Sequence, residues 1–301
     1  MSKNKRIVIT GLGTKNAIGG DVSQFVAALR QGVCGISELD LFDTSEFLTH
    51  KGGQIKNFNP RQYIPEKFSL KRMSRADQLS YAATMEALTD AELYPLPESI
   101  KEDTGMAIGG GAGGLFEAEN FYADLLSKGF GRSRFSRLSG IYCASSADRI
   151  ASNLGLLGPK ITLMTACSAG ATALGLARDL ILNGQARLML AGGVEPMCRI
   201  TYAAFNALKS VDEDVCRPFA RNRAGLSLGE AAAILVLEPL SGAEQHRSSV
   251  QFPHATHFSY ACQRCHHDWN GKTEVQTCTT SGCHDQVKTP KSDATKESPE
   301  A

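Results

Sequence analysis

The chain has 301 residues, of which 42% are hydrophobic and 21% are charged, a composition typical of globular domains. Its net charge of +1 gives no reason to expect binding to nucleic acid or to an anionic membrane, and no apolar run is long enough to span a bilayer. Histidine and cysteine are unevenly distributed, because six of the seven histidines and four of the nine cysteines follow residue 245.

This uneven composition predicts two parts of different chemistry, with a boundary near residues 241–243. The expected division is a first domain at 1–242, a junction at 243–249, a second module at 250–287 and a disordered polar tail at 288–301. The start of the chain is basic, as in a signal peptide, but the apolar run that follows is too short and ends at Gly11. We therefore expect a cytoplasmic chain that opens with a strand.

In the first part, strand patterns alternate with helix patterns. Strands are expected at 7–10, 104–108, 161–164, 188–191 and 231–237, and helices at 22–30, 73–88 and 168–183. Asp21 is the expected N-cap of the first helix, and Gly32 and Gly184 are expected just after helix ends. The alternation predicts an α/β layered fold with a mostly buried sheet.

Two glycine-rich segments follow expected strands. The segment that starts at Gly11 has Asn16 where a dinucleotide-binding fingerprint needs its third glycine. The run Gly109–Gly114 matches the G-x-G-x-x-G spacing, but no acidic residue follows about 20 positions later to bind a ribose. A tight turn between a strand and a helix is the better interpretation of this run.

The most reactive position expected in the first part is Cys167, between a strand and the helix at 168–183. The positive end of a helix dipole favours a thiolate, which is the nucleophile in covalent acyl transfer. Small residues crowd this helix, which indicates burial on most sides. A buried structural cysteine is the competing interpretation, and it is the role expected for Cys34, Cys143, Cys198 and Cys216.

Five segments of the first part share the order and spacing of one known family. They are RIVITGLG at 6–13, FNP at 58–60, GPKITLMTACSAG at 158–170, LMLAGGVEPM at 188–197 and RPFARNRAGLSLGEAAAILVLEPL at 217–240. Through them, residues 6–242 resemble the N-terminal part of the β-ketoacyl-acyl-carrier-protein synthases, members of the thiolase-like superfamily. The resemblance implies the N-terminal half of an αβαβα fold and a homodimer. It also implies that Cys167 takes an acyl group from an acyl carrier protein before condensation with a malonyl thioester.

The chain departs from this family in its later motifs. Family members use two histidines and a second oxyanion-hole amide from their C-terminal half, and no H-G-T-G-T-like segment is present. His50 is the only histidine before residue 246. We therefore expect acyl transfer without complete condensation, on a truncated domain that exposes apolar faces.

The second part has few apolar residues, so it needs a covalent or metal staple. Cys262, Cys265 and His266 form a C-x-x-C-H haem attachment signal, and Cys278, Cys283 and His284 form a longer C-x4-C-H variant. A zinc site made by the four cysteines, two disulfides, or free thiols are the alternatives. A histidine directly after both cysteine pairs favours two covalently attached c-type haems.

The segment VQFPHATHFSYACQRCHHDWNGKTEVQTCTTSGCHD at 250–285 resembles the first half of tetrahaem class III cytochromes c. The resemblance implies a small, loop-rich multihaem segment for electron transfer in the periplasm. It also implies that His254 and His266 ligate the first haem, His267 and His284 the second, and that His257 reaches a third. Nothing in the sequence identifies the redox partner.

The two parts imply different compartments, because haem attachment requires secretion whereas the acyl-transfer family works in the cytoplasm. Both resemblances also cover only part of a family member. We therefore expect a chimeric or fused chain, and an inactive ketosynthase fragment with a zinc-binding segment is the alternative.

Overall fold

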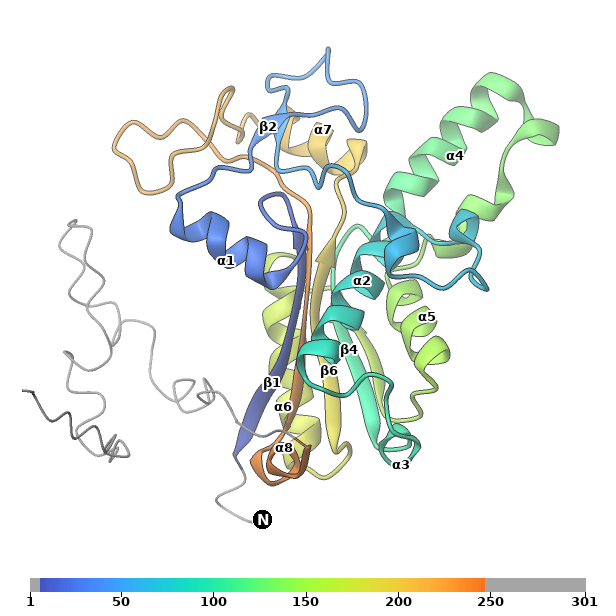
Figure 1. Ribbon diagram of the computed structural model, residues 1–301. Coiled ribbons are helices and arrows are strands. Elements are labelled where there is room, and N and C mark those ends of the chain that lie inside the picture. Colours follow the sequence, from blue (N-terminus) through green and yellow to red (C-terminus); the bar gives the residue numbers. More distant parts are fainter. Residues whose placement is uncertain (1–5, 247–301) are drawn as a thin grey trace, which may run out of the picture. The chain divides into compact units, whose positions relative to one another are not determined.

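The structure is a computed structural model that describes residues 6–246, which belong to the first of two units, residues 1–253 and 254–301. A five-stranded sheet lies at its centre, with the strand order β1-β7-β6-β4-β5 (Figure 1). The strands are β1 (Ile7–Asn16), β4 (Thr104–Gly109), β5 (Lys160–Leu163), β6 (Leu188–Glu195) and β7 (Ala231–Pro239). The expected α/β class is confirmed.

The sheet is mixed. Strand β4 pairs in parallel with both β5 and β6, whereas β7 pairs antiparallel with β6 and with β1. The three parallel strands therefore bring their carboxyl ends, at Gly109, Leu163 and Glu195, to one edge of the sheet. In α/β sheets this edge is the usual place for a binding or catalytic site.

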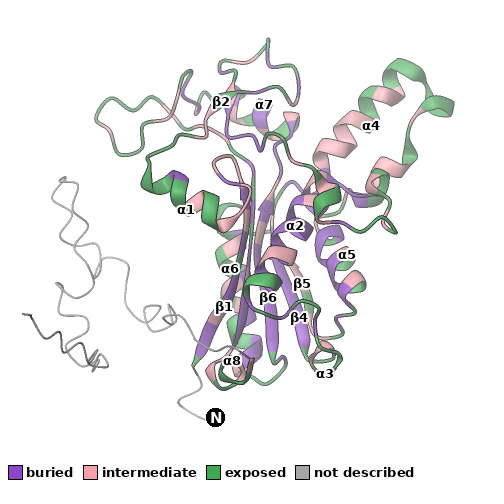
Figure 2. Ribbon diagram, in the orientation of Figure 1, coloured by how far each residue is buried: buried purple, intermediate pink, exposed green. Residues whose placement is uncertain are grey.

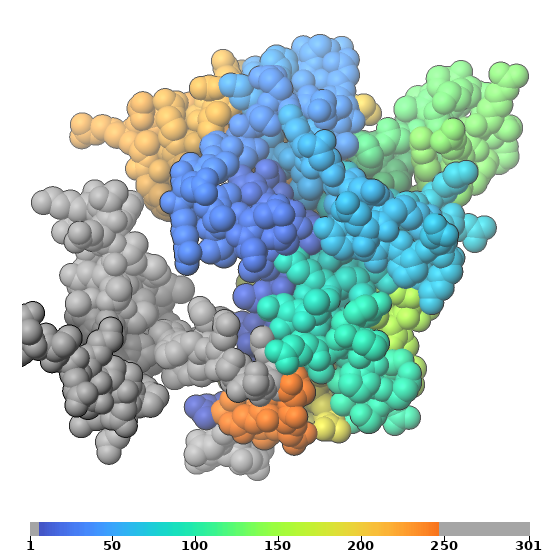
Figure 3. All heavy atoms as spheres, viewed as in Figure 1, coloured from blue at the N-terminus to red at the C-terminus, as the bar shows by residue number. Residues whose placement is uncertain are grey.

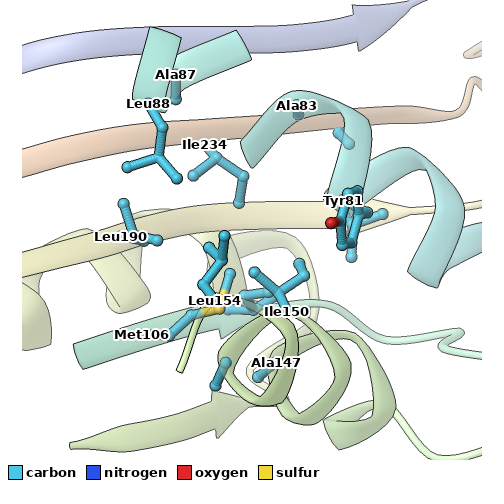
Figure 4. Packing of buried hydrophobic residues seen from close by; sticks show 14 of the residues in the cluster. Tyr81, Ala83, Ala87, Leu88, Met106, Ala147, Ile150, Leu154, Leu190 and Ile234 are labelled. Atoms are coloured by element: carbon cyan, nitrogen blue, oxygen red, sulfur yellow. The ribbon is translucent and has the colours of Figure 1, made fainter. Parts of the chain in front are cut away.

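Helices cover both faces of the sheet. On one face, α2 (Arg75–Asp90) and α5 (Ala144–Leu154) form the larger core with alternate residues of the strands, such as Met106 and Ile108 (Figure 4). On the other face lies α6 (Ala169–Leu182), packed on the intervening residues. This cluster includes alanines at positions 107, 173, 177 and 191, whose small side chains let α6 lie close to the sheet.

The remaining elements surround this core. They are α1 (Val22–Arg30), α3 (Glu98–Lys101), α4 (Leu115–Lys128), α7 (Arg199–Ala207), α8 (Leu240–His246), β2 (Ser37–Glu38) and β3 (Lys51–Gly52), with 3-10 turns at Pro60–Gln62, Leu70–Arg72, Phe130–Arg132, Phe135–Gly140 and Ala166–Ser168. Helix α4 has no buried residue and extends away from the sheet (Figure 2). In the space-filling view, α1 and the segment after it, in shades of blue, form one continuous surface (Figure 3).

Helix α1 has the predicted bounds, and the Asp21 side chain accepts the Gln24 N–H at 2.7 Å as the predicted N-cap. Gly32 and Gly184 both have a positive φ, as expected after a helix. No helix among residues 6–246 is long and apolar enough to cross a bilayer. The expected boundary at 241–243 falls within α8, where Ala243 is fully buried, so the described first unit continues to His246.

Strands β1 and β6 are longer than predicted, because both continue through glycines. A Cβ on Gly11 would lie 2.1 Å from the Ala87 carbonyl oxygen, and one on Gly192 would lie 1.9 Å from the Ala233 oxygen. These glycines permit close packing within extended strands and do not end them.

Candidate active site around Cys167

Cys167 lies in a turn between β5 and α6, at the edge where the parallel strands end. The turn Ala166–Ser168 is a short 3-10 segment, and its residue Ala166 has φ +50°, a left-handed conformation that is rare for alanine. Such strain is often found where a backbone is bent to present one side chain. Here the bend leaves Cys167 exposed, next to the first turn of a 14-residue helix.

Hydroxyl groups hold this turn together. The Ser168 hydroxyl donates to the Thr165 carbonyl at 2.9 Å, and the Thr172 hydroxyl donates to the Ser168 carbonyl at 2.9 Å. The Thr165 and Thr172 hydroxyls are 3.2 Å apart. These bonds link the residues on both sides of Cys167 to the first turn of α6, so they hold the backbone that carries the thiol.

Glycines bring the neighbouring strands against the start of α6. A Cβ on Gly109, at the end of β4, would lie 2.2 Å from the carbonyl of Ala169. A Cβ on Gly193, in β6, would lie 3.2 Å from the Cα of Gly170. Since Ala169 is two residues beyond Cys167, the ends of β4 and β6 both adjoin the backbone that carries the thiol.

The glycine run Gly109–Gly114 is a turn between β4 and α4, as predicted. Its amides are taken by protein groups: Gly110 donates to the Leu163 carbonyl at 3.0 Å and Gly114 to that of Ile141 at 3.1 Å. The amides of Gly111 and Ala112 donate to the two carboxylate oxygens of Glu195, at 2.8 and 2.7 Å. These two amides are therefore already bound by a carboxylate and are not offered to a phosphate.

The expectation that α6 is buried on most sides is wrong for the described residues. Its residues Ala169, Ala173 and Ala177 are buried against the sheet, but Ala171 and Gly175 on the other side are exposed. A Cβ on Gly175 would have no atom within 4 Å. Small residues on this helix therefore serve close packing on one face only, and within residues 6–246 no layer covers the other.

Behind the site lies a buried ionic network that sequence reasoning missed. Asp77 accepts the hydroxyls of Ser145 and Ser146, both at 3.0 Å, and pairs with Arg149 at 2.9 Å. Burial raises the pKa of Asp77, and the Ser74 backbone hydrogen bond opposes this rise. The sequence carried one signal, since Ser74 and Asp77 form a capping box at the start of α2.

A second group in this network is Glu230, whose carboxylate is fully buried and pairs with Arg75 at 2.5 Å. Beside it, Glu117 accepts the Arg75 backbone N–H at 2.8 Å, while its other oxygen is buried without a partner. Burial raises the pKa of Glu117 to about 7. These groups join α2, α4 and the loop before β7.

Among the other described cysteines, Cys143 contacts the glycine run, because its thiol donates to the Gly111 carbonyl at 3.6 Å. Cys198 is buried, Cys143 and Cys216 are partly buried and Cys34 is exposed, so a packed structural role does not fit Cys34. His50 lies 3.0 Å from the Thr44 carbonyl oxygen. The predicted haem residues lie outside the described residues, namely Cys262, Cys265, Cys278, Cys283, His254, His257, His266, His267 and His284.

Comparison with known proteins finds two families. Residues 4–243 match the family described as "Beta-ketoacyl synthase, N-terminal domain", and residues 233–299 match the "Class III cytochrome C family". The two matches overlap at 233–243, where the structure places β7 and the start of α8 in the first unit.

Individual relatives of the first unit are also ketosynthases. The chain is 34% identical over 256 residues to 3-oxoacyl-[acyl-carrier-protein] synthase 2 of Staphylococcus aureus, covering 83% of this chain and 61% of the relative. The ishigamide ketosynthase/chain length factor matches with a TM-score of 0.75 and 30% identity, over 81% of this chain and 61% of that chain.

A third match is a type II polyketide acyl-carrier protein in complex with its ketosynthase, with a TM-score of 0.67 and 26% identity over 81% of this chain and 60% of that one. The chain thus spans about three fifths of the length of these relatives.

Proposed function

Because the chain belongs through residues 4–243 to the β-ketoacyl synthase family, we propose that Cys167 accepts an acyl group from an acyl-carrier-protein thioester. One observation carries the proposal: an exposed thiol stands on a bent turn at the start of α6, where β4, β5 and β6 all end. This is the edge of the sheet at which α/β proteins place their sites.

The proposed step is a thioester exchange. The Cys167 sulfur attacks the carbonyl carbon of the acyl thioester, and the bond from that carbon to the carrier's sulfur breaks. The acyl group is then held as a thioester on Cys167, and the thiol proton of Cys167 ends on the released carrier thiol. The positive end of the α6 dipole favours the negative charge that forms on the carbonyl oxygen during the attack.

The proposed donor is an acyl carrier protein. The similar structure in which a ketosynthase is complexed with its acyl-carrier protein supports this choice, as does the similarity to a 3-oxoacyl-[acyl-carrier-protein] synthase. A homodimer through the first unit is part of the same proposal.

The proposal stops at acyl transfer. Among the described residues the histidines are His50, which contacts Thr44, and His246, which contacts Glu238 at 2.9 Å. Neither lies in a motif that matches the condensation histidines of the family, so no described group is assigned to the decarboxylative step.

The test uses the full chain mixed with an acyl carrier protein that bears a decanoyl thioester, and it measures the release of carrier thiol. We expect about one thiol per chain, and none from Cys167→Ala, because the nucleophile is gone. Cys34→Ala is the matched control, since Cys34 is also exposed. Equal release by Cys167→Ala and the unmodified chain would refute the proposal.

For the second part, we propose covalent attachment of c-type haem, supported by the match of residues 233–299 to the class III cytochrome C family. The donor set fits this group, because each cysteine pair, Cys262 with Cys265 and Cys278 with Cys283, is followed directly by a histidine. The thiols would form the thioether links, and His266 and His284 would supply axial nitrogens. When bound, haem would supply one-electron transfer.

This proposal is tested by a pyridine haemochrome spectrum with intact mass, on the chain secreted in a host that attaches c-type haem. The expected result is covalent haem at both cysteine pairs, with one attached haem fewer after replacement of Cys278 and Cys283 by serine. The chain kept in the cytoplasm is the control. If the secreted chain contains zinc and no haem, the zinc alternative replaces this proposal.

A further inference from the structure

Glu195 makes a two-point contact that the acyl-transfer step itself does not require. It is the last residue of β6, and its two carboxylate oxygens each accept one amide of the glycine run, from Gly111 at 2.8 Å and Ala112 at 2.7 Å. Hydrogen bonds to a carboxylate are stronger than bonds between neutral groups. The side chain thus ties the end of β6 to the turn that follows β4.

The turn held in this way lies directly beside the thiol's backbone. Gly109, at the start of the run, packs against Ala169, and Gly110 donates to the carbonyl of Leu163 at the end of β5. Cys167 lies between Leu163 and Ala169 in sequence. A shift of the glycine run would therefore change the space next to Cys167 on the side of β4.

The geometry points to Glu195 as a positioning residue for the proposed acyl transfer: by holding two successive amides, its carboxylate keeps the glycine run in place beside Cys167. An acyl chain on Cys167 extends past this neighbouring surface, so the position of the run affects a long substrate more than a small one. The inference rests on the proposed acylation of Cys167.

The chain contains a matched control for this contact. Glu119, on α4, also accepts two successive amides, from Arg199 at 2.8 Å and Ile200 at 3.1 Å, and like Glu195 it is partly buried. Its contact joins α4 to the start of α7 and includes no residue of the glycine run. Replacing either glutamate by glutamine puts an NH2 group opposite one backbone N–H, so the chemical change is the same at both positions.

The experiment compares the alkylation rate of Cys167 by iodoacetamide and by its N-decyl derivative, each followed by peptide mass spectrometry on the full chain. Glu195→Gln is expected to lower the rate ratio of the decyl probe to the small probe by about tenfold, with the small-probe rate within about twofold of the unmodified chain. Glu119→Gln is expected to leave the ratio unchanged. A ratio that is unchanged in Glu195→Gln, or lowered equally in both variants, overturns the inference.

Glu195→Asp covers the case in which the glutamine variant does not fold. It keeps the charge but is too short to reach both amides, so the same loss of ratio is expected, and an unchanged ratio overturns the inference. Failure of the proposed function is recognised separately. If Cys167 of the unmodified chain reacts with both alkylating probes but releases no thiol from the acyl carrier protein, acyl transfer is refuted. The ratio of the two alkylation rates still decides the role of Glu195 in that case.

Discussion

At the scale of single residues, the site combines one exposed thiol with carboxylates that hold backbone amides. Cys167 was identifiable from the sequence, because a cysteine between a strand and a small-residue helix is a local pattern. Glu195 and Glu230 were not, because their partners are far along the chain: Glu195 binds Gly111, and Glu230 binds Arg75. Only the folded sheet brings these residues together.

Glu117 gives a prediction about stability and pH. Its pKa is raised by burial to about 7, so the folded chain holds a proton that the unfolded chain has already lost between the ordinary carboxyl pKa of 4.5 and about 7. Stability contributed by this group is therefore present below the lower value and declines as pH rises to the higher one. Above that, the folded state carries a buried carboxylate with one unpartnered oxygen.

Glu117→Gln removes this charge and keeps an acceptor for the Arg75 N–H. We expect the variant to gain roughly 1–3 kcal/mol at about pH 8 and little at about pH 4.5, measured by urea unfolding at both values. A gain of the same size at both pH values would contradict this account, because it would not depend on ionisation.

At the scale of elements, glycine is where sequence and structure differ most. The sequence predicts that two strands end at residues 10 and 191, just before Gly11 and Gly192. In the structure, β1 and β6 continue through these glycines. The reason is tertiary, because the backbone of α2 at Gly11 and the backbone of β7 at Gly192 lie too close for any side chain. Helices with clear caps, such as α1 with Asp21, were predicted to the residue because their signals are local.

Two substitutions compare a glycine in close backbone contact with a glycine that has open space beside it. Gly13→Ala, in β1, would place a Cβ 1.9 Å from the Ala83 carbonyl oxygen, and we expect it to lower the free energy of unfolding by at least about 2 kcal/mol.

Gly175→Ala is the matched substitution in α6, where a Cβ meets no atom within 4 Å. It should raise the free energy of unfolding by roughly 0.5–1 kcal/mol, because alanine favours a helix. Chemical denaturation of both variants provides the measurement. Destabilisation by Gly175→Ala would mean that this face of α6 is covered in the assembled protein.

At the scale of the whole molecule, the chain joins two family matches that call for different chemistry. Residues 6–246 contain a five-stranded sheet with helices on both faces and a small two-stranded sheet, and the acyl-transfer proposal rests on that unit alone. The haem proposal rests on the spacing of cysteines and histidines, which lie outside the described residues, and on the second family match at 233–299. The two functions can therefore be tested independently on the same chain.

The central claim is that Cys167 carries the acyl group. The most direct measurement is peptide mass spectrometry of the full chain after exposure to a decanoyl thioester of an acyl carrier protein. The account predicts a decanoyl thioester on the peptide that contains Cys167. An acyl group found instead on another cysteine, such as the exposed Cys34, or no acylated peptide at all, would contradict it.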